Sequence, residues 1–222
     1  MPISEVECCD CMDFMAQFPD KFFDLAIVDP PYGLDITNIW GAEKYGYKQY
    51  TKKEWDKEIP KPEYFEKLLL KSKHSIIWGG NYFASLLPNS SCWILWDKGQ
   101  RDFTLADGEL AWTSFNKSLR IFEMSRSKAK SSNGNQKIHP TQKPIELYLW
   151  CLDKFAKPGD KILDTHMGSQ SSRIAAWKMG FDYWGCEIDP EYYAQGCARF
   201  EEERRQLSLF AQPEEPGQET LF

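Results

Sequence analysis

Short apolar runs recur along the chain, and a polar or amphipathic segment separates each from the next. The run at residues 25–28 ends in Asp29 and two prolines, which cannot continue a strand because proline donates no backbone hydrogen bond. Runs of this length without polar alternation are typical of strands buried in a parallel sheet. Seven runs predict strands, at residues 24–28, 75–80, 92–98, 108–115, 118–124, 161–164 and 181–186.

Segments with helical spacing lie between these runs. Ile145, Leu149, Leu152 and Phe155 stand three or four residues apart, as on one face of a helix. We predict helices within residues 10–18, 60–73, 81–87 and 144–155, and one after each of the last two strands. The alternation predicts an α/β fold with right-handed crossovers, in which we expect the runs 108–115 and 118–124 to pair with each other.

Two stretches fit neither period. Residues 34–60 are polar and aromatic without a clear repeat, which predicts a long loop. Residues 125–138 are rich in serine, lysine and asparagine, which predicts a mobile loop.

Composition and charge narrow the class of protein. The chain has 222 residues, enough for one domain with a sizeable core. No run approaches the roughly 18 apolar residues of a membrane span, and the N-terminus does not resemble a signal peptide, so we expect a soluble, cytoplasmic protein. The seven scattered cysteines do not suggest a disulfide framework, and with three histidines they give little support to a zinc site. We expect no metal.

The charge is unevenly distributed. The whole chain carries a formal charge of −6, but residues 116–143 hold seven basic side chains against Glu123 alone, a local balance of +6. A basic strip in an acidic protein suits a polyanion such as DNA, although a solvated basic loop is the alternative.

A small-residue loop follows the strand at 161–164. Gly168 stands between that strand and a helix, where a ligand can approach the backbone and the N–H groups of the helix N-terminus. Glu187 follows 19 residues later at the tip of the next strand, where a carboxylate can accept hydrogen bonds from ribose hydroxyls. The pair indicates a cofactor containing adenosine. The motifs of phosphate-binding and nicotinamide sites are absent, which favours S-adenosylmethionine over nucleotides; an ordinary turn is the alternative.

The sequence Asp29-Pro30-Pro31-Tyr32 forms a rigid rim after its strand. The carboxylate of Asp29 and the carbonyl of Pro30 can accept the two hydrogens of an amino group, and Tyr32 offers a flat face to a base. The exocyclic amino group of adenine is a poor nucleophile, because its lone pair is delocalised into the ring. Two acceptors would favour a tetrahedral nitrogen whose lone pair points at a methyl donor. The alternative is a turn that only ends the strand.

These motifs resemble those of the β group of DNA amino-methyltransferases. The resemblance rests on "DPPYG" at 29–33, "HPTQKP" at 139–144, "LDTHMGS" at 163–169 and "GCEIDPEYY" at 185–193, with the catalytic motif first. It implies a Rossmann-like methyltransferase fold, with a seven-stranded, mostly parallel sheet and helices on both faces. It also implies methyl transfer from S-adenosylmethionine to adenine or cytosine in DNA, and "DPPY" favours adenine. A dimer would be in keeping with the group, as would a solitary, phage or restriction-modification enzyme.

The resemblance assigns roles residue by residue. Asp29, Pro30, Pro31 and Tyr32 would form the catalytic loop. Asp10 and Cys11 would border the adenine of the cofactor, and Glu187 would hold its ribose. The expected cofactor-binding set is Asp10, Cys11, Asp29, Thr141, Lys143, Asp164, Thr165, His166, Gly168, Ser169, Glu187 and Ile188. The chain departs from the pattern at His166, where the family usually has Phe, and at Gln170, where it usually has Gly.

The same resemblance implies a domain plan. Residues 1–200 would form one domain, with the catalytic loop in 1–124, the cofactor half in 139–200 and recognition loops at about 34–60 and 124–138. A target base would be flipped out of the duplex onto Tyr32. The predicted DNA-binding residues are Trp40, Tyr45, Tyr47, Lys48, Arg126, Lys128, Lys130 and Lys137. Two alternatives stay open: cytosine as the target base, and a catalytically silent module that binds cofactor and DNA.

The tail at 201–222 contains two similar pentapeptides, "QLSLF" at 206–210 and "QETLF" at 218–222. They resemble the short peptides with which bacterial proteins dock on the DNA sliding clamp, where a glutamine bonds the pocket rim and apolar side chains enter the pocket. The candidate clamp-binding residues are Gln206, Leu207, Leu209, Phe210, Gln218, Leu221 and Phe222. The alternative is that the apolar side chains pack back on the core.

Overall fold

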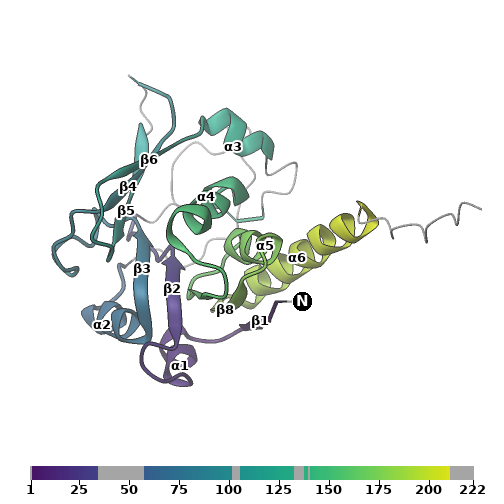
Figure 1. The fold of residues 1–222 in the computed structure, drawn as a ribbon, viewed down its shortest axis with the longest axis horizontal. Helices are drawn as coiled ribbons and strands as arrows, with labels where there is room; N and C mark the ends of the chain where they lie inside the picture. The colour runs from purple at the N-terminus through teal and green to yellow at the C-terminus, as the bar shows by residue number, and fades with distance from the viewer. Residues whose placement is uncertain (1, 35–57, 102–105, 133–137, 140, 211–222) are drawn as a thin grey trace, which may run out of the picture.

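A computed structural model describes residues 2–34, 58–101, 106–132, 138–139 and 141–210 (Figure 1). None of the helices within these ranges is long and apolar enough to cross a membrane. The recognition loop expected at 34–60 therefore lies almost entirely outside the described residues.

One mixed sheet forms the centre of the molecule. The strands, in the order in which they lie side by side, are β1 (Ser4–Glu7), β8 (Asp182–Cys186), β7 (Lys161–Asp164), β2 (Phe23–Val28), β3 (Ser72–Trp78), β5 (Gly108–Thr113), β4 (Trp93–Asp97) and β6 (Arg120–Glu123). All pairs from β1 to β3 are parallel, and β5 runs antiparallel to both of its neighbours. The predicted α/β class is confirmed.

The described sheet has eight strands where we expected seven. The extra strand is β1, whose sequence Ser-Glu-Val-Glu has no apolar run. It pairs with β8 at the edge of the sheet, and its exposed and half-buried residues alternate. An edge strand with one solvated face needs no continuous apolar run, which is why the pattern missed it.

The expected pairing of the runs 108–115 and 118–124 is wrong. Both β5 and β6 pair with β4 instead, from its two sides, β5 antiparallel and β6 parallel. Apolar patterning predicts that a segment is a strand, but it contains no information on which strand lies beside it. In this sheet the pairing is set by a hairpin between β4 and β5, which leaves β6 the outer edge of β4.

Six helices are described: α1 (Cys11–Ala16), α2 (Pro62–Lys71), α3 (Arg126–Ser132), α4 (Ile145–Phe155), α5 (Ser171–Lys178) and α6 (Pro190–Phe210). Asp10 caps α1, since its carboxylate accepts the backbone N–H of Met12 at 2.7 Å and of Asp13 at 3.4 Å. Helix α6 continues through residues 201–210, so the first part of the tail is helical.

Two local predictions are wrong. Residues 81–87 form successive turns instead of a helix. The segment starts after Gly79, whose backbone is left-handed, and its backbone hydrogen bonds join residues three apart, such as the Phe83 N–H and the Gly80 carbonyl. Residues 126–132 form α3 instead of a mobile loop. The Ser125 hydroxyl accepts the Lys128 N–H, and the buried Ala129 anchors the helix to the core. Residues 133–137 lie outside the described part.

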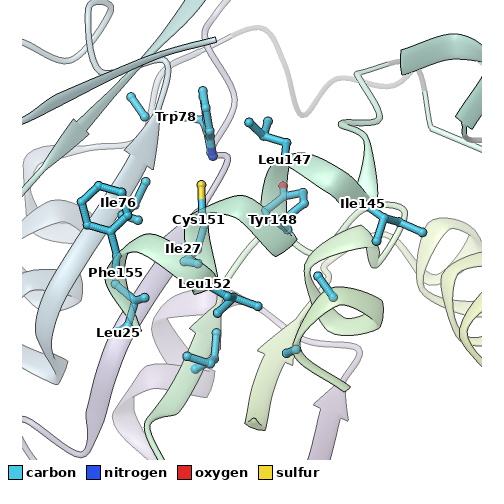
Figure 2. Close-up of a cluster of buried hydrophobic side chains, with 14 of the residues drawn as sticks. Leu25, Ile27, Ile76, Trp78, Ile145, Leu147, Tyr148, Cys151, Leu152 and Phe155 are labelled. Atoms are coloured by element: carbon cyan, nitrogen blue, oxygen red, sulfur yellow. The ribbon is translucent and has the colours of Figure 1, made fainter. Parts of the chain in front are cut away.

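Helices cover both faces of the sheet, as predicted. On β2, Leu25 and Ile27 face one core cluster, while Ala26 and Val28 face the other. The first cluster packs against α4 and α5, and the second against α1 and α2. Figure 2 shows the first, in which side chains of β2 and β3 meet Cys151, Leu152 and Phe155 of α4. The parallel strands β2, β7 and β8 end at one edge, which places the loops after them together.

Candidate active site

The loops that follow β2, β7 and β8 line a common cavity of about 310 Å³. The start of α1 and the segment before α4 complete its wall. All four predicted catalytic residues, Asp29, Pro30, Pro31 and Tyr32, line this cavity. The predicted cofactor residues that also line it are Asp10, Cys11, Thr141, Lys143, Thr165, His166, Gly168, Ser169, Glu187 and Ile188. The two motifs are separated by more than 100 residues in the chain and share one cavity in the fold.

Asp29 already has a partner on each of its carboxylate oxygens. The hydroxyl of Tyr32 donates a hydrogen bond to Oδ1 at 2.6 Å, and the ammonium of Lys143 lies 2.5 Å from Oδ2. Burial raises the pKa of Asp29 above its ordinary value, although Lys143 and the Tyr32 hydrogen bond oppose the rise. In this structure Lys143, one of the expected cofactor-binding residues, is bonded to the catalytic carboxylate.

Tyr32 is held in place from two sides. Its ring stacks on Tyr82 with centroids 5.0 Å apart and planes at 17°, and it meets the edge of Phe83 at 6.0 Å. Gly79 lies against the ring so closely that a Cβ there would come within 2.2 Å of a ring carbon. The strand–turn after β3 therefore fixes the tyrosine of the catalytic loop, a role that its sequence did not suggest.

A second charge pair adjoins the catalytic one. Glu109 of β5 lies 3.4 Å from the ammonium of Lys143, and its other oxygen bonds the ammonium of Lys98. Burial would raise the pKa of Glu109, but Lys143 and Lys98 outweigh it, and the pKa lies below its ordinary value. Neither Lys98 nor Glu109 was predicted, because each belongs to a segment that looked like an ordinary strand.

The loop after β7 is held by buried carboxylates. Asp164 accepts the backbone N–H of His166 at 3.0 Å and the Ser172 hydroxyl at 2.5 Å, and burial raises its pKa to about 7. Asp164 is absent from the cavity lining, so it supports the loop from behind. Glu187 accepts the backbone N–H of Gly168 at 2.8 Å, which ties the two cofactor elements together.

His166 is a neutral side chain in the cavity wall. Burial lowers its pKa to about 4, and its Nδ1 lies 3.0 Å from the Thr165 hydroxyl and 3.4 Å from the Tyr64 hydroxyl. A neutral imidazole carries one ring proton, on Nδ1 or on Nε2, and its other nitrogen accepts. An imidazole of this kind offers a neutral donor where the family usually has a phenyl ring.

Gln170 does not obstruct the cavity, although it replaces a glycine of the pattern. Its backbone is left-handed, with φ 59° and ψ 26°, which is the conformation that glycine adopts without strain. Its side chain is buried between α5 and α6, where Arg173 donates to its carbonyl at 2.9 Å and Gly196 gives it room. The departure therefore alters helix packing and leaves the cofactor loop open.

A group with acceptor oxygens fits this cavity. The amide nitrogen of Gln142, which lines the wall, is buried and has no hydrogen-bond partner among the described residues, while its carbonyl accepts the Ile138 N–H at 3.0 Å. An orphaned buried donor of this kind suits the carboxylate of an amino-acid moiety. Gly168, with φ +45°, leaves the loop backbone open to a ligand as well. The cavity thus fits S-adenosylmethionine.

The sequence missed several lining residues. His139 and Gln142 lie within the quoted "HPTQKP", so the motif itself was a signal that we did not extend to them. Met167 likewise lies within the quoted "LDTHMGS", whereas Cys9 lies in a cysteine-rich stretch and Tyr148 in an apolar helix. All seven cysteines are free, and no group of three or more potential metal ligands occurs in the described ranges.

The predicted DNA and clamp residues are only partly described. Arg126 and Lys128 are exposed on α3, which also carries Lys130. Trp40, Tyr45, Tyr47, Lys48 and Lys137 lie outside the described residues. In the tail, the exposed Gln206 and residues 207–210 form the end of α6. Gln218, Leu221 and Phe222 also lie outside the described part.

Comparisons with known proteins converge on one class. The family model described as DNA methylase matches residues 35–197. The Type II methyltransferase M1.MboII of Moraxella bovis is 23% identical, and the match covers 88% of this chain and 95% of that protein. The structure of the M1.HpyAVI–SAM complex superposes with a TM-score of 0.60 at 18% identity, over 89% of this chain and 100% of the other. PvuII DNA methyltransferase, described as cytosine-N4-specific, gives a TM-score of 0.60 at 15% identity, over 92% of each chain. The two structures share the predicted fold.

Proposed function

The chain belongs to the DNA methylase family that modifies exocyclic amino groups, and we propose that its target is the amino group of adenine in a base flipped out of DNA. One observation carries the proposal. The catalytic motif at 29–32 lines the same cavity as the cofactor loop and Glu187. An amino group held by Asp29 therefore lies beside the site that fits S-adenosylmethionine.

The residues that line the cavity have distinct roles in the proposed reaction. Asp29 and the carbonyl of Pro30 accept the two amino hydrogens, which turns the nitrogen lone pair toward the cofactor side of the cavity. When bound, S-adenosylmethionine supplies a methyl group activated by its sulfonium. Asp29 then takes the proton that the nitrogen loses, and its raised pKa suits that role. Glu187 is placed to accept from ribose hydroxyls, and Gln142 to donate to a carboxylate.

The choice of adenine rests on the resemblance. The motif begins with Asp29 and not with the serine that favours cytosine. One of the structures with the same fold, PvuII DNA methyltransferase, is described as cytosine-specific, so the fold leaves both bases open. Cytosine is the second candidate, and a catalytically silent binding module is the third.

One experiment separates these candidates. Unmethylated DNA is incubated with labelled S-adenosylmethionine and the wild type, Asp29→Ala or the isosteric control Asp29→Asn. The DNA is then digested and the nucleosides are identified by mass. We expect methyladenine from the wild type only, with cofactor binding retained by both variants. Methylcytosine would change the base and keep the mechanism. If the wild type binds the cofactor but transfers no methyl group, the proposed activity is refuted and the silent binding module is favoured.

Base flipping has its own test. 2-Aminopurine at the target position fluoresces when it leaves the stack, so fluorescence should rise when the protein and a cofactor analogue bind. Unchanged fluorescence at saturating protein would contradict flipping. A flipped base costs a few kcal/mol in lost stacking and pairing, which contacts in the cavity must offset.

DNA binding by α3 is part of the proposal. The helix has no acidic residue in its first turn, and its Arg126 and Lys128 are exposed. If these two side chains contact phosphates, the double change to alanine should lower the slope of log affinity against log salt by about 2. An unchanged salt dependence would show that the DNA phosphates do not contact these two side chains. We expect short loops to recognise the target sequence. Methylome sequencing that finds a long, strictly specified target site would count against this expectation.

The tail supports a second, separable activity, docking on a sliding clamp. Helix α6 projects beyond the body of the molecule in Figure 1, and Gln206 near its end is exposed. Deletion of 206–222 should abolish clamp pull-down and leave methyl transfer to naked DNA unchanged. If the protein lacking residues 206–222 still pulled down the clamp, this proposal would be refuted. A homodimer also stays a prediction, and light scattering of the purified chain measures it.

A further inference from the structure

We propose that Glu109, anchored by Lys98, is a positioning residue that receives Lys143 when the substrate amino group takes its place on Asp29. The inference rests on the proposed function, because it concerns how the catalytic carboxylate becomes available. Glu109 lies on β5 and Lys98 follows β4, so neither belongs to the motifs at 29–32 or 139–144.

The geometry is a chain of alternating charges. Asp29 Oδ2 is 2.5 Å from Lys143 Nζ, Lys143 Nζ is 3.4 Å from Glu109 Oε2, and Glu109 Oε1 bonds Lys98 Nζ. The two carboxylates and two ammonium groups sum to zero charge. The Lys143 side chain is only 3% exposed and that of Lys98 7%, so the loss of a charged partner is costly for either cation.

This arrangement answers a difficulty at the catalytic carboxylate. Each oxygen of Asp29 already has one donor, Tyr32 on one and Lys143 on the other, so an incoming amino group competes with these donors for the carboxylate. The ammonium of Lys143 is buried and needs an anion wherever it goes. Glu109 is that anion, at a distance that a side-chain rotation covers. Lys98 keeps Glu109 charged and in place, because its ammonium bonds the carboxylate oxygen that does not face Lys143.

Other groups face Asp29 as well. Tyr32 donates to it, Tyr148 of α4 lies against the cavity, and Asp164 of β7 is close enough for the two carboxylates to raise each other's proton affinity. None of these groups carries a positive charge. Lys143 is therefore the cation whose position decides the charge state of Asp29, and Glu109 is the second anion that holds it.

The alternative role of Glu109 is purely structural, as a bond between β4 and β5. The two roles differ in their effect on the maximal rate as well as on titration. Removal of the Glu109 charge leaves Asp29 as the remaining carboxylate bonded to Lys143, which also donates to the Tyr32 hydroxyl at 3.1 Å, so Asp29 should titrate at lower pH. Removal of Lys98 leaves Glu109 with only Lys143, which draws Lys143 away, so Asp29 should titrate at higher pH. A purely structural bond predicts no loss of maximal rate in a folded variant, so the rate and the two shifts are measured together.

The experiment measures single-turnover methyl transfer to DNA as a function of pH, which isolates chemistry from product release. The variants are Glu109→Gln and Lys98→Met, with Lys73→Met as the matched control, because Lys73 forms an ion pair with Asp24 at 2.6 Å outside the cavity. Thermal unfolding and cofactor binding are measured for each variant. Glu109→Asp serves as the conservative rescue.

We expect the acid limb of the rate to move to lower pH in Glu109→Gln and to higher pH in Lys98→Met. The maximal rate of Glu109→Gln should fall about 10- to 100-fold, the loss that a misplaced reacting group produces, with cofactor affinity unchanged. Glu109→Asp should recover part of the rate, and the control should match the wild type.

Shifts in the same direction, or none in a folded variant that binds cofactor, would overturn the inference. Wild-type protein that transfers no methyl group to DNA would instead refute the proposed function, so the two failures are distinguishable. A variant that does not fold is replaced by Glu109→Asp, whose acid limb should lie between those of Glu109→Gln and the wild type. An unshifted limb in that variant would also count against the positioning role.

Discussion

Gly79→Ala tests whether the turn after β3 positions the catalytic tyrosine. Gly79 has φ +72°, and a Cβ there would lie 2.2, 2.6 and 2.7 Å from three atoms of the Tyr32 ring. Ordinary contact begins at 3.4 Å, so the ring must retreat by about 1.2 Å, the difference between 3.4 and 2.2 Å. The backbone cannot yield instead, because the N–H of Gly79 is bonded to the carbonyl of Leu110 at 2.8 Å.

The displacement should reach the chemistry through one bond. The Tyr32 hydroxyl lies 2.6 Å from Asp29, and a movement of this size breaks or bends that hydrogen bond. A 1 Å misplacement near the reacting atoms costs about 100-fold in rate. We therefore expect Gly79→Ala to lower single-turnover methyl transfer by about that factor, with cofactor binding retained, since Gly79 is not among the residues of the cavity wall.

The control is Gly180→Ala. Gly180 has a similar φ of +78°, but nothing lies within 4 Å of its Cβ position. Both variants should lose about 1–2 kcal/mol of stability in urea unfolding from the left-handed backbone alone. The additional loss of rate belongs to the contact with Tyr32. Equal rates in the two variants, both near that of the wild type, would refute the reasoning.

Three further predictions concern buried titratable side chains. Asp164→Asn should become more stable relative to the wild type as the pH rises from about 4 to about 7. The pKa of Asp164 is about 7 in the native protein and 3.8 ordinarily, so in this range the native carboxyl holds a proton that the unfolded chain has lost, and the wild type loses stability as the pH rises. Urea unfolding should show a difference of about 1.4 kcal/mol for each pH unit between the two pKa values. His166→Phe should weaken S-adenosylmethionine binding by no more than about tenfold, the value of one neutral hydrogen bond, and equally at pH 6 and pH 8, since the pKa of His166 is about 4; calorimetric binding that changes with pH would contradict this. Lys143→Met should cost about 3–5 kcal/mol at pH 8 and less at pH 5, where Asp29 can take up a proton, and similar losses at both pH values would count against a charged Asp29.

The order of apolar runs was enough to predict the α/β class. Strands such as β2 and β7 are buried on both faces, and only a continuous apolar run satisfies that burial. The edge strand β1 has one solvated face and carries no such run. The pairing of β4 with both β5 and β6 was not predictable either, because apolar patterning identifies a strand without specifying which strand lies beside it.

The sequence was also enough to predict the motifs that form the site. Proline cannot continue a strand, so the Pro30–Pro31 pair marked the tip of β2, and Gly168 with Glu187 marked two further tips. Because parallel strands end at one edge, these segments had to meet, and they do. The described part of the chain also shows why Gln170 is tolerated: its side chain turns into the space over Gly196, a contact between α5 and α6 that no local pattern contains.

What only the tertiary structure decided is the electrostatic environment of the catalytic loop. Asp29, Lys98, Glu109 and Lys143 come from four separate segments, and each looks ordinary in its own. Their charges interact strongly only because the fold brings them within a few ångströms and excludes water from the two lysines. Sequence determines which groups can ionise, while burial and distance determine which of them share a proton or exchange a partner, and those two quantities exist only in the folded chain.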